Sequence, residues 1–287
     1  MSNAVPPLLT ALVDDAAVFP PGSAALADAV HAHARHRESW FAPLIGPLLL
    51  PIAALPDYAH LQAQLTECKA TAIGIGVIGE PAALDRAIPE LPAATRQIES
   101  SVAKRGEDPL PGIKRIAALC RTSQKPQEWY CEVPLAWGLM SALDELADLR
   151  TEGLRVAAKF RTGGLAAELF PSPAELAAVI CACRDRDLPF KLTAGLHHAA
   201  RHTDPETGLV HHGFLNVLVA VLAAADGGDP GELAGILAST DAVPIAGRAR
   251  EQLDRPRPLW IGFGSCSVTD PVADLTGLGL LTKPKEH

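Results

Sequence analysis

Residues 155–195 read RVAAKFRTGGLAAELFPSPAELAAVICACRDRDLPFKLTAG, and this segment decides the fold of the chain. It opens with an apolar, partly β-branched run that predicts a strand over residues 155–161. It closes with a similar run that predicts a strand over residues 189–195. The two predicted strands are separated by a stretch of helical composition.

That intervening stretch carries a helix start signal. Ser172 precedes Pro173, and Glu175 follows three residues after Ser172, which is the signature of a capping box with proline in the first turn. The Ala- and Leu-rich residues that follow predict a helix over residues 172–187. Strand followed by helix followed by strand is the repeating unit of a parallel α/β fold.

The same alternation runs through the whole chain. Strands are predicted at 12–19, 46–53, 72–78, 97–103, 128–135, 155–161, 189–195 and 259–266. Helical stretches follow most of them, at 23–37, 56–68, 81–91, 138–150 and 172–187. Eight such units in 287 residues predict one (β/α)8 TIM barrel that spans residues 1–287 as a single domain.

An open, doubly wound sheet is the competing architecture. It calls for a glycine-rich phosphate turn after the first strand. The turn here reads FPPGS at 19–23, and no GxGxxG follows any predicted strand. The barrel is therefore the favoured fold.

The connection between the seventh and eighth predicted strands, residues 196–258, is unusually long. It holds a histidine-rich loop, an apolar helix over 214–225, a Gly- and Asp-rich turn and a second helix over 231–239. We interpret it as an insertion at the active-site end of the barrel.

Composition narrows the classes of partner. The net charge is −8 and no long basic run is present, so nucleic acid and acidic membrane surfaces are poor candidates. The longest apolar run, 214–225, is too short to span a bilayer. A small-molecule substrate is expected, and a homo-oligomer stays open.

The six cysteines include no Cys-x-x-Cys pair, which favours reduced thiols. No signal peptide is recognised at the N-terminus. Both features favour a cytoplasmic protein.

Strand alternation predicts which side chains enter the barrel. In the strand 155–161, Lys159 and Arg161 face inward if the apolar residues beside them pack under the helices. The same rule predicts that six side chains on neighbouring strands also face inward: Glu99, Ser101, Tyr130, Glu132, Lys191 and Thr193. Buried charges need partners, so this set is either a structural ion-pair cluster or a catalytic cavity.

Two lysines on adjacent strands suggest a specific chemistry. One ammonium near another loses proton affinity, because like charge disfavours the charged form. A lysine with a lowered pKa is a nucleophile toward carbonyls and forms a Schiff base, with a nearby carboxylate to move protons.

Three short motifs resemble the deoxyribose-phosphate aldolase group of class I, Schiff-base aldolases. The sequence from Lys159 to Gly163 matches the Lys-x-x-Thr-Gly of that group's sixth strand, and Lys191 before Gly195 resembles its second lysine. The turn at 261–267, IGFGSCS, resembles the end of its eighth strand. The family aspartate on a middle strand has no clear counterpart, so Glu99 or Glu132 stands in for it.

The resemblance implies roles for these positions. Lys159 forms the Schiff base, and Lys191 lowers its pKa. Backbone donors at Gly195, Gly264 and Ser265 hold an anionic group such as phosphate. The Phe-Pro-Pro turn at 19–21 also resembles a group of uncharacterised bacterial barrel proteins, which implies no function.

The loop after the seventh strand holds five histidines: His197, His198, His202, His211 and His212. They form a solvated loop, or His197 or His198 reaches the cavity as an acid, a base or a substrate ligand. In a third interpretation one divalent metal ion is bound by His197 or His198 with His211 or His212 and a strand carboxylate.

These patterns predict a lyase-type enzyme that acts on a small carbonyl compound, phosphorylated or not, through an imine at Lys159, with no cofactor. Lys191 tunes that lysine, and Glu132 or Glu99 moves protons. The predicted substrate-binding residues are Arg161, Thr193, Gly195, His197, His198, Gly264, Ser265, Ser267 and Asp15. The alternatives are a metal-dependent hydrolase or isomerase that uses the histidines, and a barrel that binds a ligand without turnover.

Overall fold

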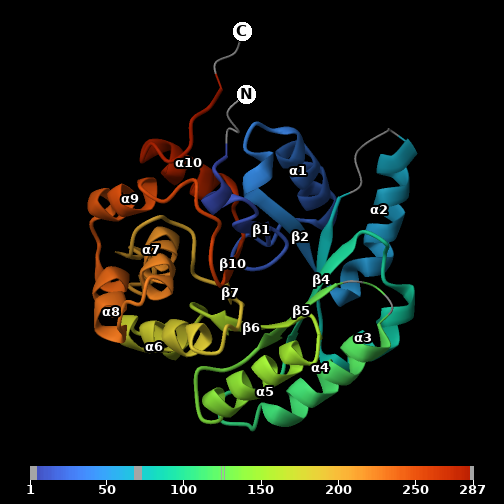
Figure 1. Ribbon diagram of the computed structural model, residues 1–287. Helices are drawn as coiled ribbons and strands as arrows, with labels where there is room; N and C mark the ends of the chain where they lie inside the picture. The colour runs from blue at the N-terminus through green and yellow to red at the C-terminus, as the bar shows by residue number, and fades with distance from the viewer. Residues whose placement is uncertain (1–4, 68–72, 124, 126, 285–287) are drawn as a thin grey trace.

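A computed structural model describes residues 5–67, 73–123, 125 and 127–284, with no side-chain description at 63–67. Eight parallel strands close into a barrel surrounded by helices, so the predicted fold class is confirmed (Figure 1). In spatial order around the barrel the strands are β1 (Val13–Asp15), β10 (Trp260–Ser265), β7 (Phe190–Thr193), β6 (Val156–Arg161), β5 (Glu128–Glu132), β4 (Thr95–Ser101), β3 (Ile75–Ile78) and β2 (Ile45–Pro51). Each predicted strand overlaps one of these. Ala72, the first residue of the third predicted strand, lies outside the described residues.

Helices follow the strands around the outside of the barrel. They are α1 (Leu26–Glu38), α2 (Leu55–Glu67), α3 (Pro81–Ala87), α4 (Leu110–Thr122), α5 (Leu139–Thr151), α6 (Pro173–Arg184) and α10 (Thr269–Gly277). Short 3-10 turns lie at Pro7–Leu9, Ala42–Leu44, Ile52–Ala54, Ile88–Glu90 and Ala167–Leu169. The helix predicted at 56–68 corresponds to α2, and its last residue, Cys68, lies outside the described residues.

The capping prediction for α6 is confirmed. The backbone N–H of Glu175 donates to Ser172 Oγ at 3.2 Å, and the backbone N–H of Ser172 donates to Glu175 Oε2 at 2.8 Å. By contrast, α4 was not predicted, because its first residues read LPG and contain two helix breakers. A proline in the first helical turn removes an N–H that has no partner there, so the helix tolerates it.

The segment between β7 and β10 contains a small hairpin, β8 (His202–Thr203) with β9 (Val210–His211), and three helices. The predicted helix at 214–225 is α7 (Phe214–Ala225), and the second predicted helix is α8 (Pro230–Ala238). The third helix, α9 (Ala242–Arg250), was not predicted. That this segment is an insertion stays a prediction.

Helix α7 is buried along almost its whole length, as expected of a helix that is apolar on every side. The Phe214 ring stacks on Phe263 of β10 at 5.5 Å between centroids. Figure 1 shows α7 inside the line formed by α6, α8 and α9. Within the described part of the chain, no helix has the length and apolarity needed to cross a bilayer.

At the N-terminal end of the barrel, Arg257 connects the segment before β1 to the start of β10. Its guanidinium donates to the backbone carbonyls of Leu8, Thr10, Ala11, Trp260 and Ile261. Burial lowers the pKa of Arg257 to about 10, and the group stays charged at neutral pH. The five carbonyl dipoles take the place of water around this cation.

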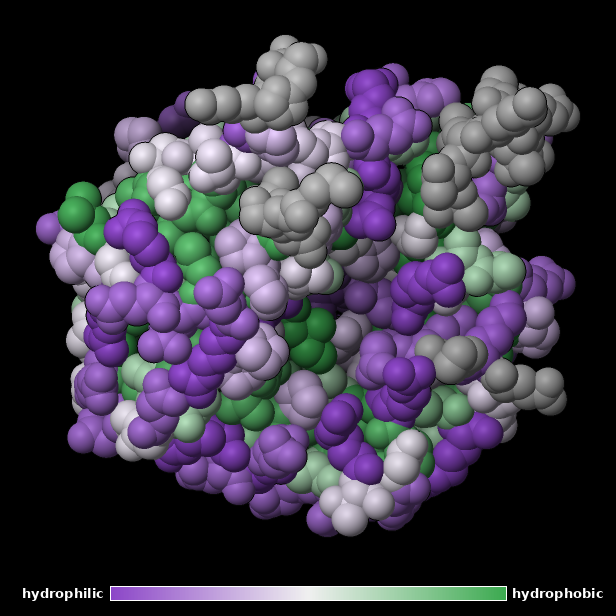
Figure 2. Space-filling view, turned by 45° about the horizontal axis from the view of Figure 1, so that its top comes forward, coloured by the Kyte–Doolittle hydropathy of each residue, from purple (hydrophilic) through white to green (hydrophobic). Residues whose placement is uncertain are grey.

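The surface is mixed in character. Figure 2 shows hydrophilic residues over much of the face in view, with apolar residues between them. The large exposed apolar side chains among the described residues are Trp137, Met140, Leu165, Val210 and Val243. The five described cysteines are free thiols.

Candidate active site

A continuous network of charged side chains crosses the inside of the barrel. Lys159 Nζ lies 2.7 Å from Glu99 Oε2 and 2.9 Å from Glu132 Oε2. Lys191 Nζ contacts Glu99 Oε1 and Asp14 Oδ2. The Glu99 carboxylate therefore bridges the two lysines, with one oxygen on each.

Strand register explains why these residues meet. Lys159 and Lys191 are register partners on β6 and β7, and Glu132 of β5 is the register partner of Lys159. Because neighbouring inward residues at one level of a barrel point to the same axis, their side chains converge. The predicted inward placement of Glu99, Glu132, Lys159 and Lys191 agrees with the structure.

Gln97 belongs to the network and was missed by the sequence analysis. Its Nε2 donates to Asp14 Oδ2 at 2.8 Å and to Glu99 Oε1 at 2.9 Å. The available signal was its place two residues before Glu99, which puts both on the same face of β4. Tyr130, predicted to face inward, lies beside the same cluster, with Lys191 Nζ 5.0 Å from its ring centroid.

Asp14, and not Asp15, enters the barrel. Asp15 turns outward, where its Oδ2 lies 3.0 Å from His33 Nδ1 and 3.6 Å from His36 Nδ1 on α1. The structure therefore adds no support to the prediction that Asp15 binds substrate. The physical reason is that consecutive residues of a strand face opposite sides of the sheet, so only one of the two aspartates reaches the interior.

Both lysines are held in the charged form. Burial works to lower the pKa of Lys159 and Lys191, but the adjacent carboxylates outweigh burial and raise both values. Glu99 is affected in the opposite sense: burial raises its pKa, and the two lysines together lower it to about 2. The expectation that the lysines lower each other's pKa is wrong for this arrangement, because each ammonium contacts two carboxylates.

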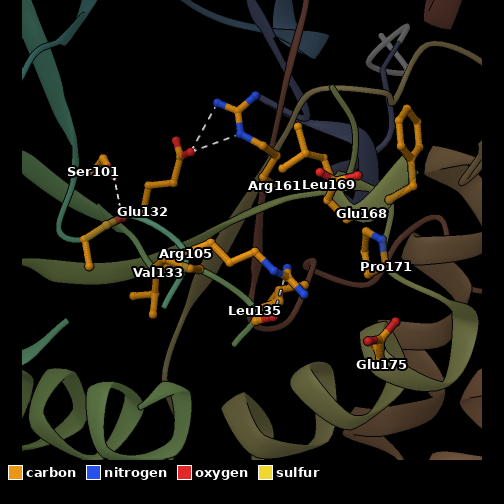
Figure 3. A pocket seen from close by; sticks show the side chains of 13 residues that line it. Ser101, Arg105, Glu132, Val133, Leu135, Arg161, Glu168, Leu169, Pro171 and Glu175 are labelled. Atoms are coloured by element: carbon orange, nitrogen blue, oxygen red, sulfur yellow. Dashed lines mark hydrogen bonds and ion pairs between the residues drawn. The ribbon is translucent and has the colours of Figure 1, made fainter. Parts of the chain in front are cut away.

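A cavity of about 270 Å³ opens beside this network, at the C-terminal ends of β4, β5 and β6 (Figure 3). Active sites of TIM barrels lie at this end. Its lining includes Ser101, Val133, Leu135 and Leu169 together with two network residues, Glu132 and Arg161. The cavity is therefore where the buried charges meet a space that can hold a small molecule.

Exposure rises stepwise from the network to the cavity. The exposed fraction of the side chain is 3% for Lys159, 18% for Glu132 and 44% for Arg161. Arg161 Nε and Nη2 each lie 3.2 Å from Glu132 Oε1, so one carboxylate is shared between a buried lysine and an accessible arginine.

The glycines predicted to hold an anion have packing roles in the structure. A Cβ added at Gly264 would lie 3.2 Å from Leu49 Cδ1 inside the barrel. Gly195, with φ of +76°, lies against the backbone of Thr162 and Gly163. Neither glycine is among the residues that line the 270 Å³ cavity.

The hydroxyl groups of two predicted residues near these glycines, Ser265 and Ser267, have partners within the protein. Ser265 Oγ donates to the Ser267 carbonyl at 2.7 Å. Ser267 Oγ lies 3.1 Å from Thr269 Oγ1 and accepts from the Asp270 N–H. Thr193 is half-buried, and its carbonyl accepts from Thr162 Oγ1 at 3.3 Å.

Two histidines lie where β7 and β10 end. His197 Nδ1 is 3.4 Å from Ser265 Oγ and 3.7 Å from Cys266 Sγ, and burial lowers its pKa. His198 Nδ1 lies 3.3 Å from Asp274 Oδ2 on α10. Neither residue lines the 270 Å³ cavity.

The remaining histidines are held mainly by backbone groups. His211 Nδ1–H donates to the Gly195 carbonyl at 3.1 Å, and the His211 ring stacks on His202. His212 Nε2–H donates to the Pro171 carbonyl at 2.7 Å, and burial lowers its pKa to about 4. Among the described residues, no group of three or more His, Cys, Asp or Glu side chains is arranged to hold a metal ion. This geometry adds no support to the metal alternative.

Comparison of the chain with protein-family models and with curated proteins finds no match. The resemblance to Schiff-base aldolases therefore stays a prediction, and function has to be inferred from the geometry of the site.

Proposed function

We propose that the protein is a lyase-type enzyme that acts on a small carbonyl compound through an imine at Lys159. The observation that carries the proposal is the position of this lysine. Lys159 is buried, and its Nζ lies 2.9 Å from Glu132, which lines the cavity, and 2.7 Å from Glu99. A lysine beside two proton acceptors, one of which lines a ligand-sized space, suits imine chemistry.

Lys159 is charged at rest, so the reaction needs a proton acceptor beside it. Glu132 is suited to this role, because its Oε2 contacts Lys159 Nζ while its Oε1 faces Arg161 at the cavity. Burial penalises an ammonium and a carboxylate more than a neutral amine and a neutral acid. Transfer of one proton from Lys159 to Glu132 produces the nucleophile without leaving a new buried charge.

The free amine then forms the imine. Nζ bonds to the carbonyl carbon of the substrate, and the carbonyl oxygen leaves as water with the two amine protons. The imine nitrogen takes the proton held by Glu132, which returns Glu132 to its carboxylate form. The product is a positively charged iminium at Lys159.

This positive nitrogen withdraws electrons from the neighbouring carbon–carbon bond. The electron pair of the bond between the substrate α and β carbons moves toward nitrogen, while Glu132 takes the proton of the β-hydroxyl group. The β fragment leaves as a carbonyl compound. Return of a proton to the α carbon, followed by addition of water, releases the second product and Lys159.

Lys191 has a different role in this proposal from the one the resemblance implies. Its ammonium is held by Asp14 and Glu99, and it keeps Glu99 ionised. An ionised Glu99 fixes the position of Lys159 through the 2.7 Å contact. Lys191 is thus a positioning residue that acts through Glu99.

Borohydride reduction in the presence of small aldehydes and ketones tests the proposal. A covalent adduct is expected on Lys159, detected by mass spectrometry of the peptide that contains it. Lys159→Arg should abolish the adduct, and Lys114→Arg, a matched change at an exposed lysine of α4, should not. No adduct with any carbonyl compound, phosphorylated or not, would rule out the imine and favour a structural ion-pair cluster.

A further inference from the structure

Glu132 connects a buried cation with an accessible one. Its Oε2 lies 2.9 Å from Lys159 Nζ, and its Oε1 lies 3.2 Å from both Nε and Nη2 of Arg161. Figure 3 shows the Arg161 guanidinium directed at the Glu132 carboxylate at the edge of the cavity. A ligand that alters the hydrogen bonds of Arg161 therefore alters the charge environment of Lys159 through the Glu132 carboxylate.

Arg161 is the cation of the network that a ligand in the cavity can reach. Its side chain is half-exposed, whereas both lysines are buried. The distances of 3.2 Å are longer than the 2.7–2.9 Å typical of strong charge-assisted hydrogen bonds. A guanidinium binds a carboxylate through two parallel hydrogen bonds. The carboxylate of a ligand can therefore form the hydrogen bonds to Arg161 that Glu132 forms in its absence.

We propose that the substrate carries a carboxylate near its carbonyl group, as in a 2-oxo acid, and that this carboxylate takes the place of Glu132 on Arg161. The Glu132 carboxylate, freed from Arg161, then takes the proton of Lys159. This inference rests on the proposed imine function. It adds the substrate class and the step that deprotonates Lys159.

Electrostatic interactions favour proton transfer from Lys159 to Glu132 when the ligand binds. Arg161 and Lys159 both stabilise the ionised form of Glu132. When a ligand anion neutralises Arg161 and removes its hydrogen bonds to Glu132, Glu132 gains more proton affinity than Lys159 does, because it is the direct partner of Arg161. One proton moves from Nζ to Oε2, and no charge enters or leaves the protein in that step.

The cavity suits a small ligand of this kind. Its volume of about 270 Å³ corresponds to roughly nine water molecules at ~30 Å³ each. Val133, Leu135 and Leu169 provide apolar lining for a short carbon chain, while Arg161 binds the anion. The lining also includes Arg105, Glu168 and Glu175, so charged groups of both signs surround the space for the ligand.

Matched carbonyl probes test the substrate class. Pyruvate and its neutral counterpart pyruvamide differ only in the carboxylate. Borohydride trapping on Lys159 should be roughly tenfold or more faster with pyruvate, the effect of about one unit in proton affinity. Arg161→Gln should make the two rates similar, and Arg115→Gln, at an exposed arginine of α4, should leave the preference unchanged.

A second measurement detects proton transfer to Glu132 with a ligand that cannot form an imine. Lactate has the carboxylate but no carbonyl, and lactamide is its neutral counterpart. Infrared difference spectra should show one carboxyl group becoming protonated when lactate binds, and no such change with lactamide. The signal should be absent in Glu132→Gln and in Arg161→Gln.

The outcomes separate the two proposals. Equal trapping of pyruvate and pyruvamide, or no infrared signal at high lactate concentration, overturns the carboxylate exchange. If no carbonyl compound is trapped on Lys159 but lactate still protonates Glu132, the imine function fails and the exchange stands.

Discussion

At the scale of single residues, Glu99 holds the two lysines of the site together. It is completely buried, and each of its oxygens contacts one ammonium. A buried charge that loses its partner is strongly destabilising, whereas an ion pair at the surface contributes little.

Glu99→Gln should therefore destabilise the fold strongly. The substitution keeps the shape of the side chain but leaves Lys159 and Lys191 with one carboxylate each. We expect a loss of about 3–5 kcal/mol in the free energy of unfolding, measured by urea denaturation at pH 7. Glu152→Gln, at an exposed residue paired with Arg121, should change it by less than ~1 kcal/mol. Similar values for the two variants would contradict the bridging role of Glu99.

Asp15 links stability to pH. Burial alone would raise its pKa, but the side chains of His33 and His36 and a hydrogen bond from the backbone N–H of Ala17 outweigh burial and lower the pKa from 3.8 to about 2. A carboxylate with a lowered folded pKa contributes stability that is present above its unfolded pKa. That contribution is lost as the pH falls through the folded value.

Asp15→Asn should cost about 2 kcal/mol at pH 7, from a shift of nearly two units. The difference from the wild type should shrink as the pH falls from 4 toward 2. Urea denaturation at pH 7, 4, 3 and 2 measures it, with the exposed Asp85→Asn as a control. A difference that stayed constant down to pH 2 would show that Asp15 acts by packing and not by its charge.

At the scale of elements, a glycine on β2 leaves the space that the Asp14 side chain occupies. Gly46 lies beside Asp14, and an added Cβ at this position would overlap Asp14 Oδ1. Asp14 is the partner of Lys191, so the absence of a side chain on β2 decides where a carboxylate on β1 can point.

Gly46→Ala should displace Asp14 and destabilise the protein by about 1–3 kcal/mol, the usual cost of overpacking. Gly235→Ala on α8 is the matched control. An added Cβ there meets nothing within 4 Å, and alanine is the better helix former, so we expect a gain of about 0.5–1 kcal/mol. Thermal unfolding of both variants measures the contrast. Equal effects would mean that the space at Gly46 is not limiting.

At the scale of the whole molecule, Arg257 joins the segment before β1 to β10. The pairing of β1 with β10 closes the barrel, and Arg257 binds carbonyls on both sides of it. Arg257→Gln would leave the part-buried carbonyls of Leu8, Trp260 and Ile261 without this donor, at about 1–3 kcal/mol each.

We therefore expect Arg257→Gln to lower the free energy of unfolding by at least ~3 kcal/mol. The readout is urea denaturation, together with hydrogen exchange at the amides of β1 and β10. Arg248→Gln, at an exposed arginine paired with Glu232, should have a small effect. Normal protection of β1 in Arg257→Gln would contradict this role in closure.

Alternation and periodicity in the sequence were enough to predict the eight strands, most of the helices between them, and the inward direction of Lys159, Lys191, Glu99 and Glu132. These features depend on local geometry, because a strand repeats every two residues and a helix every 3.6. Helix α4 was missed where local signals conflict, at the LPG of its first turn.

Only the tertiary structure decided which charges are partners and where a ligand can bind. The sharing of Glu99 between two lysines, the choice of Asp14 over Asp15 and the cavity beside Arg161 depend on register between strands that are far apart in the chain. Carboxylates on neighbouring strands outweigh burial, so the lysine pKa values rise where the sequence motif alone predicts that they fall. Such a balance of opposing electrostatic contributions is set by distances in three dimensions, which a sequence motif does not contain.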